Sequence, residues 1–129
     1  MKFYYKENGY SCTWKNNLKG EYWSNMEHAK IKVCIPLTEY KEIVSDIRLQ
    51  EDTPTIIFKV HKEKDEVVNW GTYSSDESEL WKFTAIIERI SYSSKFKDGF
   101  VMAHIDCLIQ YNDKCDKSEL RELILNELV

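Results

Sequence analysis

Apolar and polar residues alternate over much of this chain, a pattern that predicts strands. In KIKVCI (30–35) the aliphatic residues Ile31, Val33 and Ile35 fall on one face and the lysines on the other. A period of two with a single apolar face is typical of a half-buried strand. Comparable runs predict further strands at residues 2–6, 10–15, 55–61, 67–73, 80–92 and 100–111.

Short polar connections between these segments predict hairpins. Asn8-Gly9 separates the first two strands and is the strongest short hairpin signal in the chain. The charged KEKDE (62–66) and SSKFKDG (93–99) join the later pairs, and tight connections of this kind favour antiparallel pairing. The segment 16–28, which is rich in Asn and Gly, predicts a loop.

Two segments with apolar residues at spacings of three and four predict helices. The first spans about 38–49, with Thr38 as its N-cap, and the second follows Asp116, which forms a capping-box-like pair with Glu119. The predicted order is therefore βββ-α-ββββ-α. We expect an α+β fold over one domain, 1–129: a mainly antiparallel sheet of about six to seven strands with two amphipathic helices packed on it.

Composition narrows the class of protein. The chain has 129 residues, of which 43% are hydrophobic and 13% aromatic, which predicts a folded globule rather than a disordered chain. No run is long and apolar enough for a membrane span, and the first residues lack a secretory signal, so we expect a cytoplasmic protein. We predict buried free thiols rather than disulfides for the four cysteines, Cys12, Cys34, Cys107 and Cys115.

Motifs for common chemistries are missing from the sequence. It contains no closely spaced CxxC or HxxxH pair, no glycine-rich phosphate loop and only four glycines. We therefore expect no metal, no cofactor and no enzymatic activity.

Charge divides the chain into two unequal halves. Residues 1–64 carry 11 basic against 9 acidic residues, whereas residues 65–129 carry 7 against 13. The acidic half includes WGTYSSDESELW (70–81), in which aromatic residues bracket Asp76, Glu77 and Glu79. Carboxylates steer the approach of a basic protein, and aromatic residues anchor it.

The acidic, aromatic stretch 70–81 predicts that this chain is a small non-enzymatic protein that neutralises a basic protein partner by direct occlusion. The most concrete form is a bacterial immunity protein, or antitoxin, against a nuclease toxin. A simpler reading of the same stretch is a turn capped by Ser74, with Trp70 and Trp81 in the core. The predicted partner contacts are Asp65, Glu66, Tyr73, Asp76, Glu77 and Glu79.

Nucleic-acid binding is the alternative function. The N-terminal hairpin interleaves lysines with aromatic residues, as platforms for single strands do, although a net charge of −4 opposes it. The residues concerned are Lys2, Lys6, Lys15 and Lys19 with Tyr4, Tyr5, Tyr10 and Trp14.

A small nuclease or hydrolase is a further alternative. His104 and Asp106 are two residues apart on a predicted strand and share its face, so the carboxylate can orient the imidazole as a general base. His61 is the candidate for the matching acid, and Cys107 falls on the opposite face.

An unpaired edge strand could also support a dimer of this chain.

Overall fold

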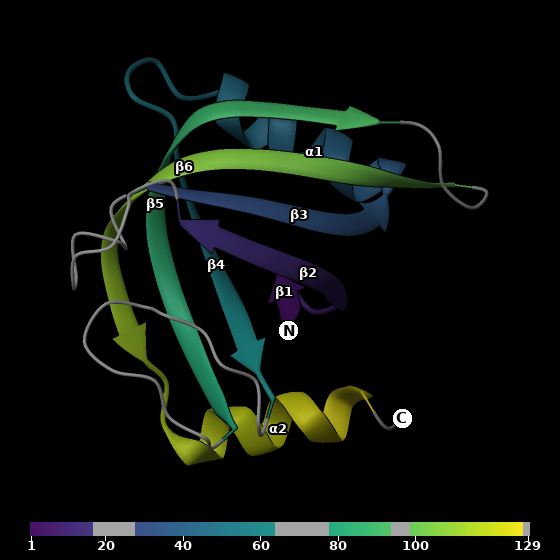
Figure 1. The fold of residues 1–129 in the computed structure, drawn as a ribbon, viewed down its shortest axis with the longest axis vertical. Coiled ribbons are helices and arrows are strands. Elements are labelled where there is room, and N and C mark those ends of the chain that lie inside the picture. The colour runs from purple at the N-terminus through teal and green to yellow at the C-terminus, as the bar shows by residue number, and fades with distance from the viewer. Residues whose placement is uncertain (17–27, 64–77, 94–98, 128–129) are drawn as a thin grey trace.

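The strands of this protein close into a barrel. The computed structural model describes residues 1–16, 28–63, 78–93 and 99–127. Within these ranges six antiparallel strands follow the order β1-β2-β3-β6-β5-β4, and β4 pairs back to β1 (Figure 1). The elements are β1 Lys2–Tyr4, β2 Gly9–Asn16, β3 His28–Pro36, α1 Leu37–Arg48, β4 Thr55–Lys62, β5 Glu79–Ser93, β6 Phe100–Lys114 and α2 Lys117–Glu127.

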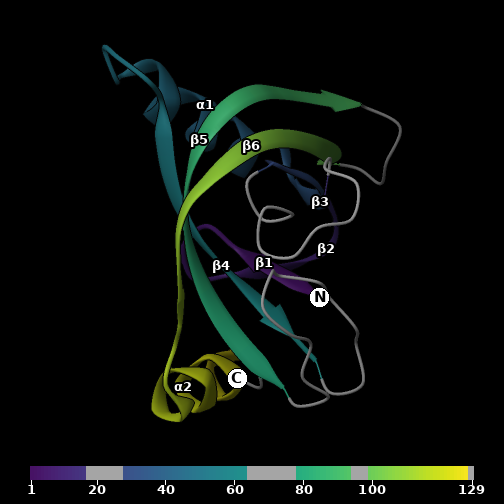
Figure 2. The same ribbon diagram turned by 60° about the vertical axis from the view of Figure 1, so that its left-hand side comes forward.

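The mixed fold and the antiparallel pairing agree with the prediction, but the closure was not foreseen. The two helices do not cover one sheet face together. Figure 2 shows them at opposite ends of the molecule, and α1 contacts β3 and β6 whereas α2 contacts β5. The predicted strand 67–73 and most of the predicted loop 16–28 lie outside the described residues.

An aromatic cluster fills part of the barrel. Phe58 stacks on Phe3 with ring centroids 5.0 Å apart and on Phe83 at 5.5 Å, and Trp14 lies 4.9 Å from Phe83. Burying each of these rings contributes about 1.5–3 kcal/mol from the apolar area removed from water. Alternation along β3 and β6 supplies the aliphatic part of the interior: Ala29, Ile31, Val33, Ile35, Val101, Ala103, Ile105, Cys107 and Ile109 are all buried.

The two helices begin differently. Pro36 is the N-cap of α1 and makes no side-chain capping bond, so the prediction of Thr38 as the cap was wrong. Proline suits this boundary because its fixed φ is compatible with a helix start. For α2 the predicted cap is confirmed: Asp116 Oδ1 accepts a hydrogen bond from the Glu119 backbone N–H at 2.9 Å. Neither helix of the described ranges combines the length and apolarity needed to cross a bilayer.

The cysteines in the described ranges are free thiols. Cys12 and Cys107 are buried, whereas Cys34 and Cys115 are partly exposed. Desolvation inside the barrel raises the pKa of the Cys107 thiol to about 12. Cys107 therefore acts as a small apolar side chain rather than as a nucleophile.

Gly9 makes room for the ring of Tyr4 on the neighbouring strand. The two residues are directly paired between β1 and β2, and a Cβ atom at Gly9 would lie 2.4 Å from a ring carbon of Tyr4. We expect Gly9→Ala to destabilise the protein by about 1–3 kcal/mol, because the buried ring or the short strand must move. Urea unfolding measures the change.

The control for Gly9→Ala is a double-mutant cycle with Tyr4→Ala. Without the ring, the added methyl group has space, so Gly9→Ala should cost much less in the Tyr4→Ala background. Equal costs in the two backgrounds would contradict the packing of Tyr4 over Gly9.

Candidate functional site

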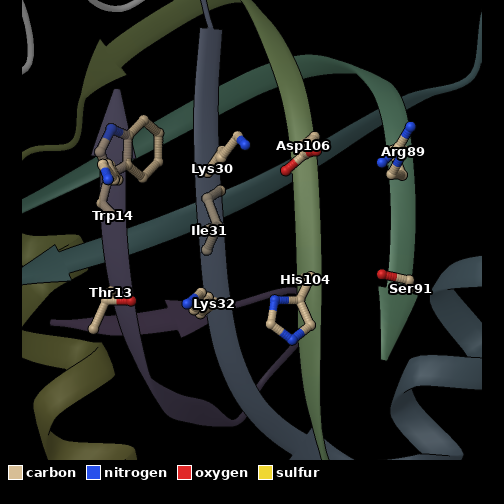
Figure 3. A pocket seen from close by; sticks show the side chains of 10 residues that line it. Thr13, Trp14, Lys30, Ile31, Lys32, Arg89, Ser91, His104 and Asp106 are labelled. Carbon is tan, nitrogen blue, oxygen red and sulfur yellow. The ribbon is translucent and has the colours of Figure 1, made fainter. Parts of the chain in front are cut away.

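An open groove of about 790 Å³ lies on the outer face of β2, β3, β6 and β5 (Figure 3). Strand register arranges its outward side chains in two rows that cross these four strands. Adjacent strands are about 4.8 Å apart, so each row spans about 14 Å, and the rows are about 6.8 Å apart along the strands. The first row is Thr13, Lys32, His104 and Ser91, and the second is Lys15, Lys30, Asp106 and Arg89.

Positive charge dominates this groove, which we call the basic groove. Four of its side chains are cationic, and Asp106 is its one carboxylate. Within the described ranges none of the four cations forms an ion pair, whereas Lys6 pairs with Glu42 and Lys114 with Glu79 elsewhere. Like charges gathered on one face repel one another, and a bound anion relieves that repulsion.

A β-bulge in β5 brings Arg89 into the groove. The register with β6 shifts between Ile87 and Arg89, so that Ile87 pairs with Cys107 and Arg89 pairs with Asp106. Glu88 is the extra residue, and beyond it the alternation of faces is reversed. Without the bulge, Arg89 would point to the same side as the inward-facing Ile87.

The carboxylate of Glu88 does not neutralise Arg89. Glu88 Oε1 lies 3.0 Å from Nδ1 of His28, a residue at the start of β3 that does not line the groove. Among the residues that the structure describes, the Arg89 guanidinium therefore has no ion-pair partner, and it lies opposite Asp106 of β6. Arginine presents a planar fork of donors that suits phosphate and carboxylate ligands.

His104 and Asp106 share the groove face, as the alternation predicted, and Cys107 points into the barrel. No hydrogen bond links His104 to Asp106 in the described part of the chain. His61 does not belong to this site: it is buried on β4, and its Nε2 lies 2.8 Å from Ser78 Oγ. His61 therefore does not line the groove that holds His104 and Asp106.

The N-terminal hairpin does not present the predicted aromatic platform. Tyr4 is buried, and Trp14 packs against the core through Phe83, although it also borders the groove. Tyr5 donates a hydrogen bond to Asp46 of α1. Of the four hairpin lysines, Lys15 lines the groove and Lys19 lies outside the described residues.

Most of the predicted acidic contacts cannot be placed in the structure. Asp65, Glu66, Tyr73, Asp76 and Glu77 lie outside the described residues, as do Trp70 and Ser74.

Glu79 is described and is only 6% exposed at the start of β5, with its Oε2 2.9 Å from Lys114 Nζ. The Glu79 carboxylate is therefore already paired within the protein. Trp81 is partly buried and packs against the core, in agreement with the simpler reading of this stretch.

Sequence reasoning missed most of the basic groove. Lys30 and Lys32 were recognised only as the polar face of a strand. Their sequence signal is the alternation with aliphatic residues, which shows that both lysines point outward. The signal for Arg89 is weaker: the inward-facing Ile87 and Ile90 are three positions apart in the sequence instead of two, as a bulge requires.

The lining of the groove suits anions better than metal ions. In the described ranges no group of three or more His, Cys, Asp or Glu side chains is placed to hold a metal. The groove instead offers ammonium, guanidinium, imidazole and hydroxyl donors. Comparisons with protein-family models, curated proteins and solved structures found no match to this chain.

Proposed function

We propose that this protein binds single-stranded nucleic acid through phosphate contacts in the basic groove. The observation that carries the proposal is the set of four cations on one recessed sheet face, none of them ion-paired in the described ranges. Charge-assisted hydrogen bonds from lysine and arginine to phosphate oxygens dominate the affinity of such interfaces. Thr13 and Ser91 add hydroxyl donors at the two ends of one row.

The dimensions of the groove favour a short, flexible strand over a duplex. Its two rows cover about 14 Å by about 6.8 Å, enough for a few phosphates. Duplex DNA is read by elements that protrude into its grooves, whereas this face is recessed. Stacking contributes little because Trp14 packs against the core, so we expect binding with little sequence preference.

The overall charge of the protein sets the strength and salt dependence of this binding. The net charge of −4 repels a polyanion at long range, and Asp106 lies between Lys30 and Arg89 within the groove. Attraction therefore acts at short range only. We expect modest affinity that falls steeply as salt is added.

Fluorescence anisotropy with labelled single strands tests the proposal. A 12-nucleotide DNA or RNA strand should bind at about 50 mM salt, and the logarithm of the association constant should fall with the logarithm of salt concentration. Each phosphate contact contributes a slope of about −0.7, so four contacts give about −3. The matching duplex should bind more weakly. No binding at low salt, or binding that salt does not change, would contradict the proposal.

Occlusion of a basic protein partner by the acidic half is the second candidate. It is favoured by the excess of 13 acidic over 7 basic residues in 65–129. A basic protein that co-purifies stoichiometrically should bind the Asp76→Lys/Glu77→Lys variant at least about tenfold more weakly, because the attraction becomes repulsion. Surface plasmon resonance compares it with Glu51→Lys/Asp52→Lys, which makes the same charge change on the exposed loop after α1. Equal affinities of the two variants would refute the assignment.

A further inference from the structure

Among the described strands, the second half of β5 is an open edge of the sheet, although the barrel is closed alongside its first half. Pairing between β4 and β5 ends at Thr55 and Ile86, and the Ile87 N–H donates to the Pro54 carbonyl at 2.9 Å. Beyond this point, residues 88–93 have β6 on one side. Within the described ranges they make no backbone hydrogen bond on the other side, and Figure 1 shows this stretch as the outermost strand. We call it the β5 edge.

Helix α1 lies beside this edge and offers a hollow of about 440 Å³. The ring of Tyr40, which lines the hollow, meets the ring of Tyr92 in the edge with centroids 4.7 Å apart, so the hollow borders the edge. Apolar surface is open here, since Leu49 is 78% exposed and Tyr92 47% exposed. The hollow is lined by Tyr40, Lys41, Val44, Ser45, Arg48 and Leu49.

The charges around the hollow define what it can accept. In the described part of the chain, Lys41 and Arg48 form no ion pair. Beyond the bulge, Arg89 and Ser91 point to the outer face. Ile90 and Tyr92 point to the opposite face, where Ile90 packs against the core and Tyr92 meets Tyr40 of α1. A strand added to this edge would therefore meet apolar and cationic groups on its α1 side and Arg89 on its outer side.

We propose that the β5 edge and α1 bind an extended segment of a partner protein in which apolar and acidic residues alternate. An open strand edge supplies backbone hydrogen bonds, and a neighbouring hollow selects alternate side chains. Apolar side chains of the segment pack on Tyr92 and Leu49, and its carboxylates face Arg89. The end of the bound segment, or acidic residues that flank it, reaches Lys41 and Arg48.

A second copy of this chain fits the edge less well. Antiparallel pairing of two β5 edges would place Arg89 of both copies on the same face of a continuous sheet, and like charges across strands are destabilising. The cationic Lys41 and Arg48 of both copies would add to the repulsion. Charge complementarity therefore favours an acidic segment over self-association.

Blocked octapeptides test the proposal by NMR. A peptide of alternating leucine and glutamate should shift the amide signals of 88–93 and of α1, whereas alternating leucine and lysine should not. Two N-methylated versions of the acidic peptide test the backbone hydrogen bonds to the edge. One is methylated at the backbone nitrogen of every leucine, and the other at that of every glutamate. In a bound strand, the amides of either the leucines or the glutamates face the β5 edge, but not both. One methylated version should therefore bind at least tenfold more weakly than the other. Equal binding of both would overturn the proposal.

Protein variants locate the peptide and distinguish this site from the basic groove. Leu49→Asp and Arg48→Glu should each weaken peptide binding at least tenfold. Leu125→Asp, at an exposed position of α2, should leave it unchanged. The groove variant Lys30→Glu/Lys32→Glu, two strands away from Arg89, should weaken it by no more than a few fold. Unshifted signals for 88–93 would overturn the proposal. So would sedimentation as a dimer that Tyr92→Lys converts to a monomer, because a second copy would then occupy the edge.

Discussion

The double variant Lys30→Glu/Lys32→Glu is expected to bind single-stranded nucleic acid at least about 100-fold more weakly than the wild type at low salt. Each lysine supplies a charge-assisted contact of about 1.5–3 kcal/mol, and about 1.4 kcal/mol corresponds to a factor of ten. The substituted carboxylates also repel the phosphates. Anisotropy titration measures the loss, and the slope against salt should become shallower by about 1.4.

The matched control changes the same amount of charge on α2. Lys117→Glu/Arg121→Glu alters two exposed cations that lie outside the groove and should weaken binding by no more than a few fold. Both double variants should remain folded, since exposed substitutions away from structural contacts shift stability by about 0.5 kcal/mol or less. If the two variants lose affinity equally, net charge controls binding and the groove does not.

Phe83→Ala is expected to lower the free energy of unfolding by about 3–5 kcal/mol, the largest effect on stability that we predict. The Phe83 side chain is completely buried between Phe58 and Trp14. Its removal leaves a cavity that strands held in a closed ladder cannot collapse to fill. Equilibrium unfolding in urea measures the loss, which is a large part of the 5–15 kcal/mol typical of a domain.

Two further variants make this result interpretable. Phe83→Leu keeps most of the volume and should restore much of the lost stability. Tyr111→Ala removes an aromatic side chain that is 68% exposed on β6 and should change the free energy of unfolding by about 0.5 kcal/mol or less. A cost of less than about 1 kcal/mol for Phe83→Ala would show that the ring is not part of the barrel interior.

Local elements could be predicted from the sequence because burial alternates along each strand and recurs every third or fourth residue along each helix. Closure could not. It depends on the pairing of Phe3 with Val60, through a strand of three residues whose pattern is too short to indicate a second neighbour. An open sheet and a closed barrel produce the same alternation, so periodicity does not distinguish them.

The basic groove was harder to predict than the fold. Its residues come from β2, β3, β6 and β5, and neither the contact between β3 and β6 nor the position of the bulge follows from local spacing. His104 and Asp106 were placed on one face correctly, because a single strand holds both. The cations around them became neighbours only when the strand order was known.

The pairing of β3 with β6 also determines when this protein can fold during its synthesis. Ala29 pairs with Cys107 and Ile31 with Ile105, so a ribosome adding about 5–20 residues per second completes β3 on the order of 4–14 s before its partner exists. Throughout that interval the backbone hydrogen-bonding edge of β3 lacks the strand that pairs with it. The barrel therefore cannot form progressively from the N-terminus, and a nascent chain halted before β6 is the state most exposed to aggregation and to chaperone binding.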